Sequence, residues 1–302
     1  MSWWTIAGLA GVVSVGTLAL MAIEQLVAGR RPAPAMELRR AGALLRRPIS
    51  RPYAIDSWLY HLAPPLLLAS AVLALAMVPW SPGFLGIDLN TGAIMFSAAL
   101  AYVTPAILMA GWGSGQALSV VGGFRFLALM LAYEMPIVMA VTAAGTPAAS
   151  LRPTYIVEVQ AAVPMAVAQP LAFALFVPAV MAVAYIRPFD LPQAEGELGG
   201  GAFAHFSGAH AAILSLAQKV LILAAAGMTS ALFLGGWYGP LLPEWAWMPV
   251  KTLGVAALML WAGRKVPRFE IEALLSFAWK AAIPLAIGAI AWAGLVTLFF
   301  YR

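Results

Sequence analysis

The sequence contains no cysteine among its 302 residues. This absence excludes disulfide bonds, thiolate nucleophiles and cysteine-ligated iron–sulfur clusters from the chain. Histidine is also scarce, because His61, His205 and His210 are the only three, and they are too few and too scattered along the sequence for a convincing metal cage or for haem ligation. Any redox centre is therefore expected to belong to another chain.

Charge is the second scarcity. Asp, Glu, Lys and Arg together make up 10% of the residues, hydrophobic residues make up 63%, and the mean hydropathy is +0.90. A soluble domain carries about 25% charged residues, so this composition excludes a water-soluble globule and predicts a protein solvated by lipid. The apolar run at 3–29 lacks a basic leading segment and a small-residue cleavage site, which favours a retained transmembrane helix over a signal peptide.

Long apolar runs are abundant. A helix needs about 20 apolar residues to cross the hydrocarbon, since its backbone groups must be satisfied within the segment. Eight runs qualify, at about 4–28, 57–79, 92–111, 124–145, 166–186, 210–235, 247–263 and 278–300. The sequence therefore predicts an all-α, polytopic membrane protein with about eight transmembrane helices, forming a single integral membrane domain over residues 1–302.

The basic residues are distributed unevenly about these eight expected helices. Thirteen of the seventeen fall on one side, seven of them in the loop 29–56: Arg30, Arg31, Arg39, Arg40, Arg46, Arg47, Arg51, Arg125, Arg187, Arg264, Lys265, Arg268 and Lys280. The positive-inside rule places this side in the cytoplasm and both termini outside a cell (inner) membrane. Within the loop, "MELRRAGALLRR" spaces Leu38 and Leu45 one heptad apart among arginines, which suits an amphipathic helix on the membrane surface.

Glu134 lies near the middle of the fourth expected span. A charged side chain at that depth costs at least about 2.5–3.5 kcal/mol, so the carboxyl is expected to face the interior of the bundle or to be protonated. Tyr133 and Arg125 add polar groups to the same short region. These features favour a proton carrier, and the alternative is a protonated carboxyl that only hydrogen-bonds to a neighbouring helix.

Two further ionisable residues lie inside expected spans. Glu24, about one turn from the cytoplasmic end of the first span, either joins a proton path or extends to the interface. Lys219, beside Gln218 in the sixth span, requires a partner or a deprotonated state. A packed ion pair with a loop carboxylate is an equally good interpretation of Lys219.

The loop 187–209 gathers scarce acids and glycines on the cytoplasmic side. It contains Asp190, Glu195 and Glu197 and ends in the glycines at 199–201. Glycines permit close approach of the backbone, and neighbouring carboxylates raise one another's pKa, so such a group can hold and pass a proton. An ordinary acidic surface loop is the alternative.

Three stretches together resemble subunit 1 of respiratory complex I and its relatives in membrane-bound energy-converting nickel–iron hydrogenases. They are "GWGSGQALSVVGGFRFLALMLAYE" at 111–134, "RPFDLPQAEGELGGGAFAHFSG" at 187–208 and "PRFEIEALLSFAWKAAIP" at 267–284. They occur in the order found in the family, and eight spans match its usual number. The resemblance covers most of residues 57–302.

The resemblance implies a non-catalytic subunit that docks a cytoplasmic redox arm beside antiporter-like membrane subunits. Iron–sulfur clusters, with nickel–iron or flavin, would belong to the partners, no cofactor would be bound by this chain alone, and a quinone is possible. Five residues fall on motif positions associated with the quinone chamber and its proton path: Arg125, Glu134, Asp190, Glu195 and Glu197. The expected proton path adds Glu24 and Lys219, and Arg125, Tyr133 and Arg187 would act by electrostatics and positioning.

The chain departs from the family pattern at several polar positions. Tyr185-Ile186 stands where the family has Asn-Arg, and Gln193 stands where it has Glu. His205-Phe206 and Gln218-Lys219 each stand in place of a Glu-Tyr pair. Glu270 replaces an Arg of the third stretch. These changes favour the hydrogenase-like branch, in which a redox module drives proton or sodium translocation. A divergent quinone-chamber subunit is the alternative, and a stand-alone ion-coupled transporter using Glu134 and Lys219 as a binding pair is a more distant one.

Overall fold

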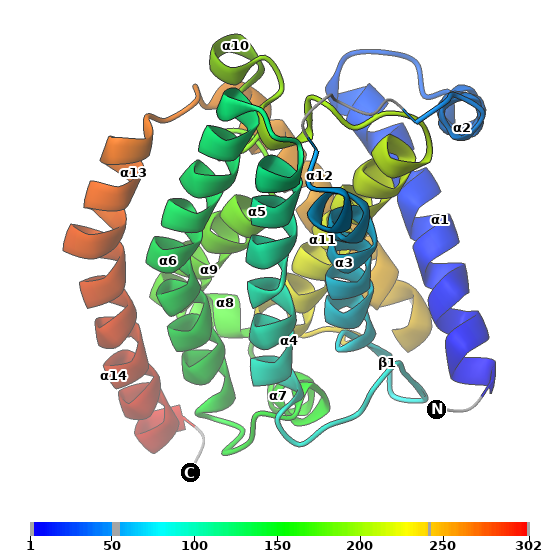
Figure 1. The fold of residues 1–302 in the computed structure, drawn as a ribbon. Coiled ribbons are helices and arrows are strands. Elements are labelled where there is room, and N and C mark those ends of the chain that lie inside the picture. The colour runs from blue at the N-terminus through cyan, green and yellow to red at the C-terminus, as the bar shows by residue number, and fades with distance from the viewer. Residues whose placement is uncertain (1–2, 50–54, 241–242, 301–302) are drawn as a thin grey trace.

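The computed structural model describes residues 3–49, 55–240 and 243–300. The described chain is a bundle of helices with one short hairpin of strands (Figure 1). The elements are α1 (Trp3–Val27), α2 (Pro34–Leu45), α3 (Ser57–Ala76), β1 (Pro79–Ser81), β2 (Phe84–Leu85), α4 (Gly92–Ala101), α5 (Val103–Gly113), α6 (Ala117–Gly145), α7 (Pro153–Val159), α8 (Met165–Ala168), α9 (Pro170–Val183), α10 (Glu195–Leu198), α11 (Gly208–Phe233), α12 (Glu244–Lys265), α13 (Ile271–Phe277) and α14 (Ile283–Phe300). A 3-10 turn covers Gly201–Phe203, and a π-helical turn, Ala278–Ala282, joins α13 to α14.

Seven of the eight expected spans are helices, or pairs of joined helices, long and apolar enough to cross a membrane. The all-α polytopic fold is therefore confirmed. The fifth span, expected at 166–186, is instead divided into α8 and the 14-residue α9. Pro170 begins α9 and has no N–H to continue the helical ladder, which accounts for the break at this position.

One arginine and one lysine lie further inside their helices than expected from the sequence. Arg125, expected at the cytoplasmic start of the fourth span at 124–145, lies about two turns inside the helix because α6 begins at Ala117. Lys280, assigned to the basic face, lies in the π-helical turn inside the last span, with its side chain exposed. Both helices extend further toward the basic face than their most apolar residues indicated.

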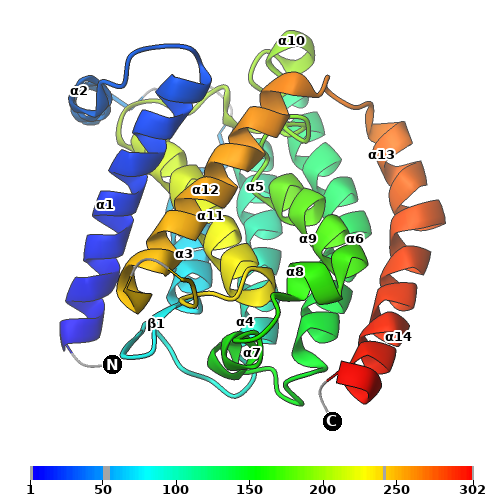
Figure 2. The ribbon, with the colours of Figure 1, turned by 180° about the vertical axis from the view of Figure 1, so that it is seen from behind.

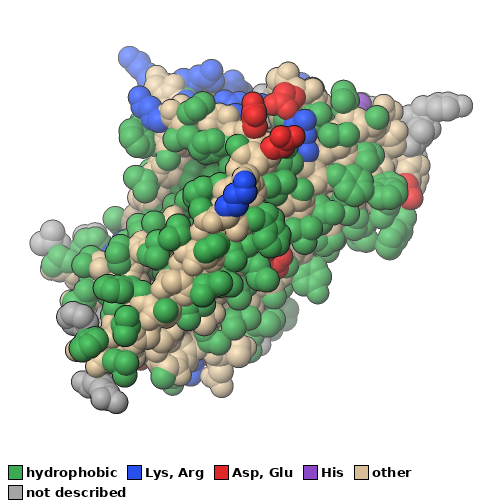
Figure 3. Space-filling view, turned by 90° about the vertical axis from the view of Figure 1, so that its left-hand side faces the viewer, with side chains coloured by type: hydrophobic (Ala, Val, Ile, Leu, Met, Phe, Trp, Pro, Cys, Tyr) green, Lys and Arg blue, Asp and Glu red, His purple; other side chains and the backbone are tan. Residues whose placement is uncertain are grey.

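The two ends of the bundle differ in charge. The start of α1 and the end of α14 lie at one end, whereas α2 and α10 lie at the other, as the views from the front and from behind agree (Figures 1 and 2). On the side where α13 and α14 face the viewer, most of the surface is hydrophobic, and the charged side chains gather mainly toward one end (Figure 3). This end, called the basic face below, carries the described part of loop 29–56, the loop 187–209 and the end of α12.

The centre of the bundle is α11. Every residue from Val220 to Phe233 is buried, and many of them are Ala, Gly, Ser or Thr. Small residues allow helix backbones to approach closely inside a membrane, where packing rather than the hydrophobic effect drives association. α11 consequently packs against α3 and α12, and its first turns reach the basic face.

Candidate functional site

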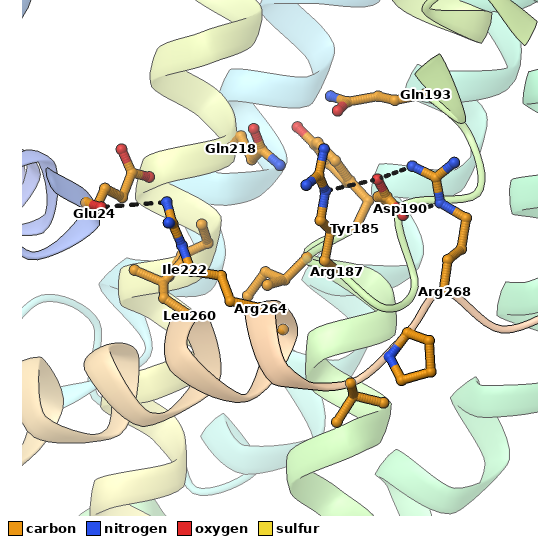
Figure 4. A pocket seen from close by; sticks show the side chains of 14 residues that line it. Glu24, Tyr185, Arg187, Asp190, Gln193, Gln218, Ile222, Leu260, Arg264 and Arg268 are labelled. Atoms are coloured by element: carbon orange, nitrogen blue, oxygen red, sulfur yellow. Dashed lines mark hydrogen bonds and ion pairs between the residues drawn. The ribbon is translucent and has the colours of Figure 1, made fainter. Parts of the chain in front are cut away.

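A cavity of about 900 Å³ opens at the basic face between the end of α1, the loop after α9, α11 and the end of α12. Its lining is unusually polar for this chain (Figure 4). The polar residues are Glu24, Tyr185, Arg187, Asp190, Gln193, Gln218, Arg264 and Arg268. The cavity therefore collects side chains from four segments that are far apart in the sequence.

Asp190 is held by two arginines of this cavity. Its carboxylate, 7% exposed, accepts two hydrogen bonds from Arg268, at 2.8 Å from Nε and 2.6 Å from Nη2. The Nε atom of Arg187 lies 3.4 Å from the same carboxylate. Such a bidentate pair fixes geometry as well as charge, so Asp190 ties the loop after α9 to the segment after α12.

Close backbone contacts around glycines shape this loop. Gly201 has a φ of +54°, and a Cβ atom there would clash with the carbonyl oxygen of Pro192. A Cβ at Gly122 of α6 would lie 2.7 Å from the same oxygen, and a Cβ at Gly263 of α12 would clash with the carbonyl oxygen of Arg187. The expectation that glycines allow close backbone approach is confirmed at Gly201.

Glu24 and Lys219 form an ion pair beside the cavity. Nζ of Lys219 donates to Oε2 of Glu24 across 2.8 Å, with the two side chains 16% and 32% exposed. The backbone oxygen of Glu24 also accepts a hydrogen bond from Arg264 at 3.5 Å. The partner of Lys219 is thus a carboxylate of the first helix, rather than a loop carboxylate or Glu134.

Arg125 and Glu197 form a second ion pair, at 2.6 Å, on the outer side of the loop. Neither residue lines the cavity. Asp190 and Glu197 are therefore each paired with an arginine, and the expected cluster of mutually interacting carboxylates is not formed by these two. The side chain of Glu195 lies outside the described residues.

Glu134 lies in the interior of α6 and is partly buried. Within the part of the chain that the structure describes, its carboxyl has no hydrogen-bond or ion-pair partner, and it does not line the cavity. The neighbouring Tyr133 turns its ring toward Phe189, with the centroids 5.8 Å apart, and lines a second, apolar cavity of about 630 Å³. The expected grouping of Glu134, Tyr133 and Arg125 is therefore not observed, since Arg125 pairs with Glu197.

Several residues of the cavity are not among the site residues expected from the sequence. Arg268 is one of the thirteen basic residues on the cytoplasmic side, and its place in the stretch 267–284, which resembles the family pattern, is the signal that could have identified it. Tyr185 is almost completely buried. Gln193 stands out in the sequence as a departure from the family pattern, and Gln218 does so as well as being a polar residue beside Lys219 inside an expected span. The fold brings both glutamines into the cavity.

The histidines are scattered in sequence but not all in space. Nδ1 of His61 lies 3.2 Å from Nε2 of His210, and the hydroxyl of Tyr60 donates to the carbonyl oxygen of His205. Among the described residues no group of three or more His, Cys, Asp or Glu is arranged to hold a metal ion. The histidine pair therefore packs the junction of α3 and α11 at the edge of the basic face.

Comparison with known proteins gives one consistent result. The family model described as NADH dehydrogenase matches residues 41–294. The H subunit of the NADH-quinone oxidoreductase of Syntrophotalea carbinolica is 34% identical over 245 residues, which cover 78% of this chain and 74% of the relative. An H subunit from Geobacter sulfurreducens, numbered 2 in that organism, is 33% identical over 265 residues, covering 85% and 80%. The H subunit from Dehalococcoides mccartyi strain 195 is 32% identical over 292 residues, covering 92% and 81%.

Proposed function

The chain belongs to the NADH dehydrogenase family, that of complex I subunit 1, and on this premise we propose that it anchors a cytoplasmic redox module and couples its electron transfer to ion translocation. The module would dock on the basic face, where the arginine-rich end of the bundle and the 900 Å³ cavity lie together. Iron–sulfur clusters, with nickel–iron or flavin, would be held by partner subunits, and antiporter-like membrane subunits would lie alongside.

A hydrogenase-like module is supported by the position of the residues that depart from the family pattern, because several of them lie in the cavity. Tyr185, Ile186, Gln193 and Gln218 all line the cavity. Replacement of family carboxylates by two glutamines in one cavity changes its charge and its hydrogen-bonding groups together. Such a change fits a subunit whose redox partner acts on something other than quinone.

A quinone-reducing complex is the second candidate, and it is favoured by the names of the relatives. The cavity offers hydrogen-bond donors from Tyr185, Arg187 and Arg268, and donors of this kind fit the carbonyl oxygens of a quinone headgroup. If a quinone binds, these side chains would orient its headgroup at the basic face.

The coupling would act through the ion pairs at the cavity. Both oxygens of Asp190 accept hydrogen bonds from Arg268, so protonation of Asp190 would neutralise its carboxylate and weaken that pair. Glu24 faces the same cavity and is neutralised by Lys219. A change of charge in the docked module would shift both pairs, and Glu134 would receive the proton at greater depth, while Arg125 holds Glu197 electrostatically.

The transporter hypothesis depended on Glu134 and Lys219 as a binding pair. Lys219 binds Glu24 instead, and family membership places the chain with subunits of a multisubunit enzyme. Neither observation favours a stand-alone transporter.

The first experiment is to tag the chain in its native membrane, extract it gently and assay the purified material for nickel, iron, flavin and hydrogen evolution. Nickel with hydrogen evolution supports the hydrogenase-like module. Iron and flavin with quinone reduction favours the quinone-reducing complex. A chain that purifies alone and without metal contradicts the redox-subunit function.

A further inference from the structure

Two buried glutamines on either side of α8 contrast sharply. Gln160, 2% exposed, donates from Nε2 to the oxygens of Ile156 and Ala231, and its Oε1 accepts from two backbone N–H groups. Gln169 is 0% exposed, and neither its Nε2 nor its Oε1 has a hydrogen-bond partner among the described residues. The hydrogen bonds of Gln160 therefore account for the burial of its polar side chain, whereas nothing among the described residues compensates the buried amide of Gln169.

Gln169 immediately precedes α9 at the break after α8, and its side chain makes no capping hydrogen bond to that helix. The first N–H groups of a helix have no partner within that helix and carry a positive partial charge, and Pro170 contributes no N–H at all. On the other side of the break, Nε1 of Trp292 donates to the carbonyl oxygen of Ala168. The N–H of Phe173 donates to the backbone oxygen of Gln169 at 3.2 Å. The break thus combines the buried, unpaired amide of Gln169 with the remaining N–H groups of the first turn of α9.

An unpartnered buried amide costs about 1–3 kcal/mol, and a buried water that makes two to four hydrogen bonds to such groups removes that cost. The amide oxygen and the N–H groups of the first turn of α9 supply such partners. We propose that the break between α8 and α9 is a hydrated site, at which Gln169 holds a proton-conducting water inside the membrane.

The site lies further along the proton route of the proposed function, on which this inference rests. The ring of Phe126 on α6 contacts the ring of Tyr185, just after α9, with centroids 6.3 Å apart. Glu134 lies eight residues along α6 from Phe126, and Gln169 lies fourteen residues before Val183, where α9 ends. These separations are about 12 Å and about 21 Å along the two helices. The water at Gln169 would accept a proton arriving from the level of Glu134 and release one toward the opposite face, so that no proton is consumed.

The absence of cysteine from this chain permits a direct test of hydration. In membranes containing the assembled complex, Gln169→Cys is treated with a small methanethiosulfonate reagent, and the isolated chain is measured by mass spectrometry. Because the reactive thiolate forms only where water reaches it, Gln169→Cys should react at least about 10-fold faster than Ala179→Cys, a position within α9 that is also 0% exposed. Equal rates would overturn the proposal.

A second pair of variants separates this inference from the proposed function. Gln169→Met should lower the number of protons moved per electron at least about 2-fold in an assembled complex, whereas Gln160→Met, which breaks four structural hydrogen bonds, should reduce assembly. Normal coupling in Gln169→Met together with impaired coupling in Glu134→Gln would overturn the hydrated site alone. Normal coupling in both would overturn the proton path itself.

Discussion

At the scale of single residues, the cavity is organised by charge compensation. Asp190, almost buried, meets Arg268 and Arg187, and Glu24 meets Lys219. Removing one member of a buried pair leaves an uncompensated charge, which is more costly than replacing both members. At these paired residues, the choice between replacing one member and replacing both therefore separates effects on function from effects on stability.

Asp190→Asn keeps the shape of the side chain but removes its charge. We expect coupled turnover to fall by at least about 10-fold, because a group that transfers protons commonly contributes more than this, while the complex still assembles. Proton uptake by vesicles measured together with electron transfer checks the first expectation, and the yield of intact complex checks the second. Glu134→Gln is expected to behave in the same way, and normal pumping by both variants would show that the proton-path assignment is wrong.

Lys219→Met should destabilise the protein because it strands the carboxylate of Glu24. Glu24→Gln combined with Lys219→Met should recover part of that loss, with a coupling energy of about 1–2 kcal/mol for contacting residues. Thermal unfolding of the purified complex measures the four members of this cycle. Glu158→Gln, at an exposed position, should leave the melting temperature unchanged. Strict additivity of the two substitutions would contradict an energetically significant pair.

At the scale of elements, the acidic loop depends on backbone contacts as much as on ion pairs. The oxygen of Pro192 accepts a hydrogen bond from the N–H of Ala202 at 2.9 Å, and Gly122 and Gly201 both approach this oxygen. The loop is thereby fastened to α6 through atoms that bear no charge.

Gly201→Ala should disturb the loop through two effects, the positive φ and the clash with Pro192. Gly199 is the matched control, because it has a φ of +58° with no atom near an added Cβ. Gly199→Ala should cost about 1–2 kcal/mol, the usual penalty of the left-handed conformation, and Gly201→Ala should cost more. Thermal unfolding and protease sensitivity of the loop distinguish them, and equal effects would indicate that the close approach to Pro192 is unimportant.

At the scale of the whole molecule, the bundle is polarised. The described basic residues of loop 29–56 and of 264–268 lie at the end opposite to the start of α1 and the end of α14 (Figure 1). A membrane protein with this asymmetry is expected to insert with its basic end in the cytoplasm.

Cysteine labelling in vesicles tests this orientation. Arg40→Cys on α2 should react with an impermeant maleimide only in inside-out vesicles, and Glu158→Cys on α7 only in right-side-out vesicles. Both positions are exposed, and the chain has no other cysteine. Exchange of the two patterns would place both termini in the cytoplasm and would move the docking surface to the other side of the membrane.

The sequence by itself determined that the protein is surrounded by lipid and where most of its membrane-spanning helices lie. Length and apolarity of the runs predict spans because every backbone group must be satisfied inside lipid, and seven of the eight expected runs were confirmed as helices or joined helices that can cross a membrane. Even the exception, the run 166–186, carried its own signal, since Pro170 interrupts it. The three quoted stretches were sufficient to identify the family.

Only the tertiary structure decided which polar residues meet. Lys219 lies 195 positions from Glu24, and Arg268 lies 78 positions from Asp190, and no local pattern specifies such pairs. They depend on the packing of α11 against its neighbours and on glycines that let the loop 187–209 approach α6 and α12. Residues grouped by sequence proximity, such as Glu134 with Arg125, were separated for the same reason: a helix turns neighbouring side chains to different faces, and each face then meets its own partners.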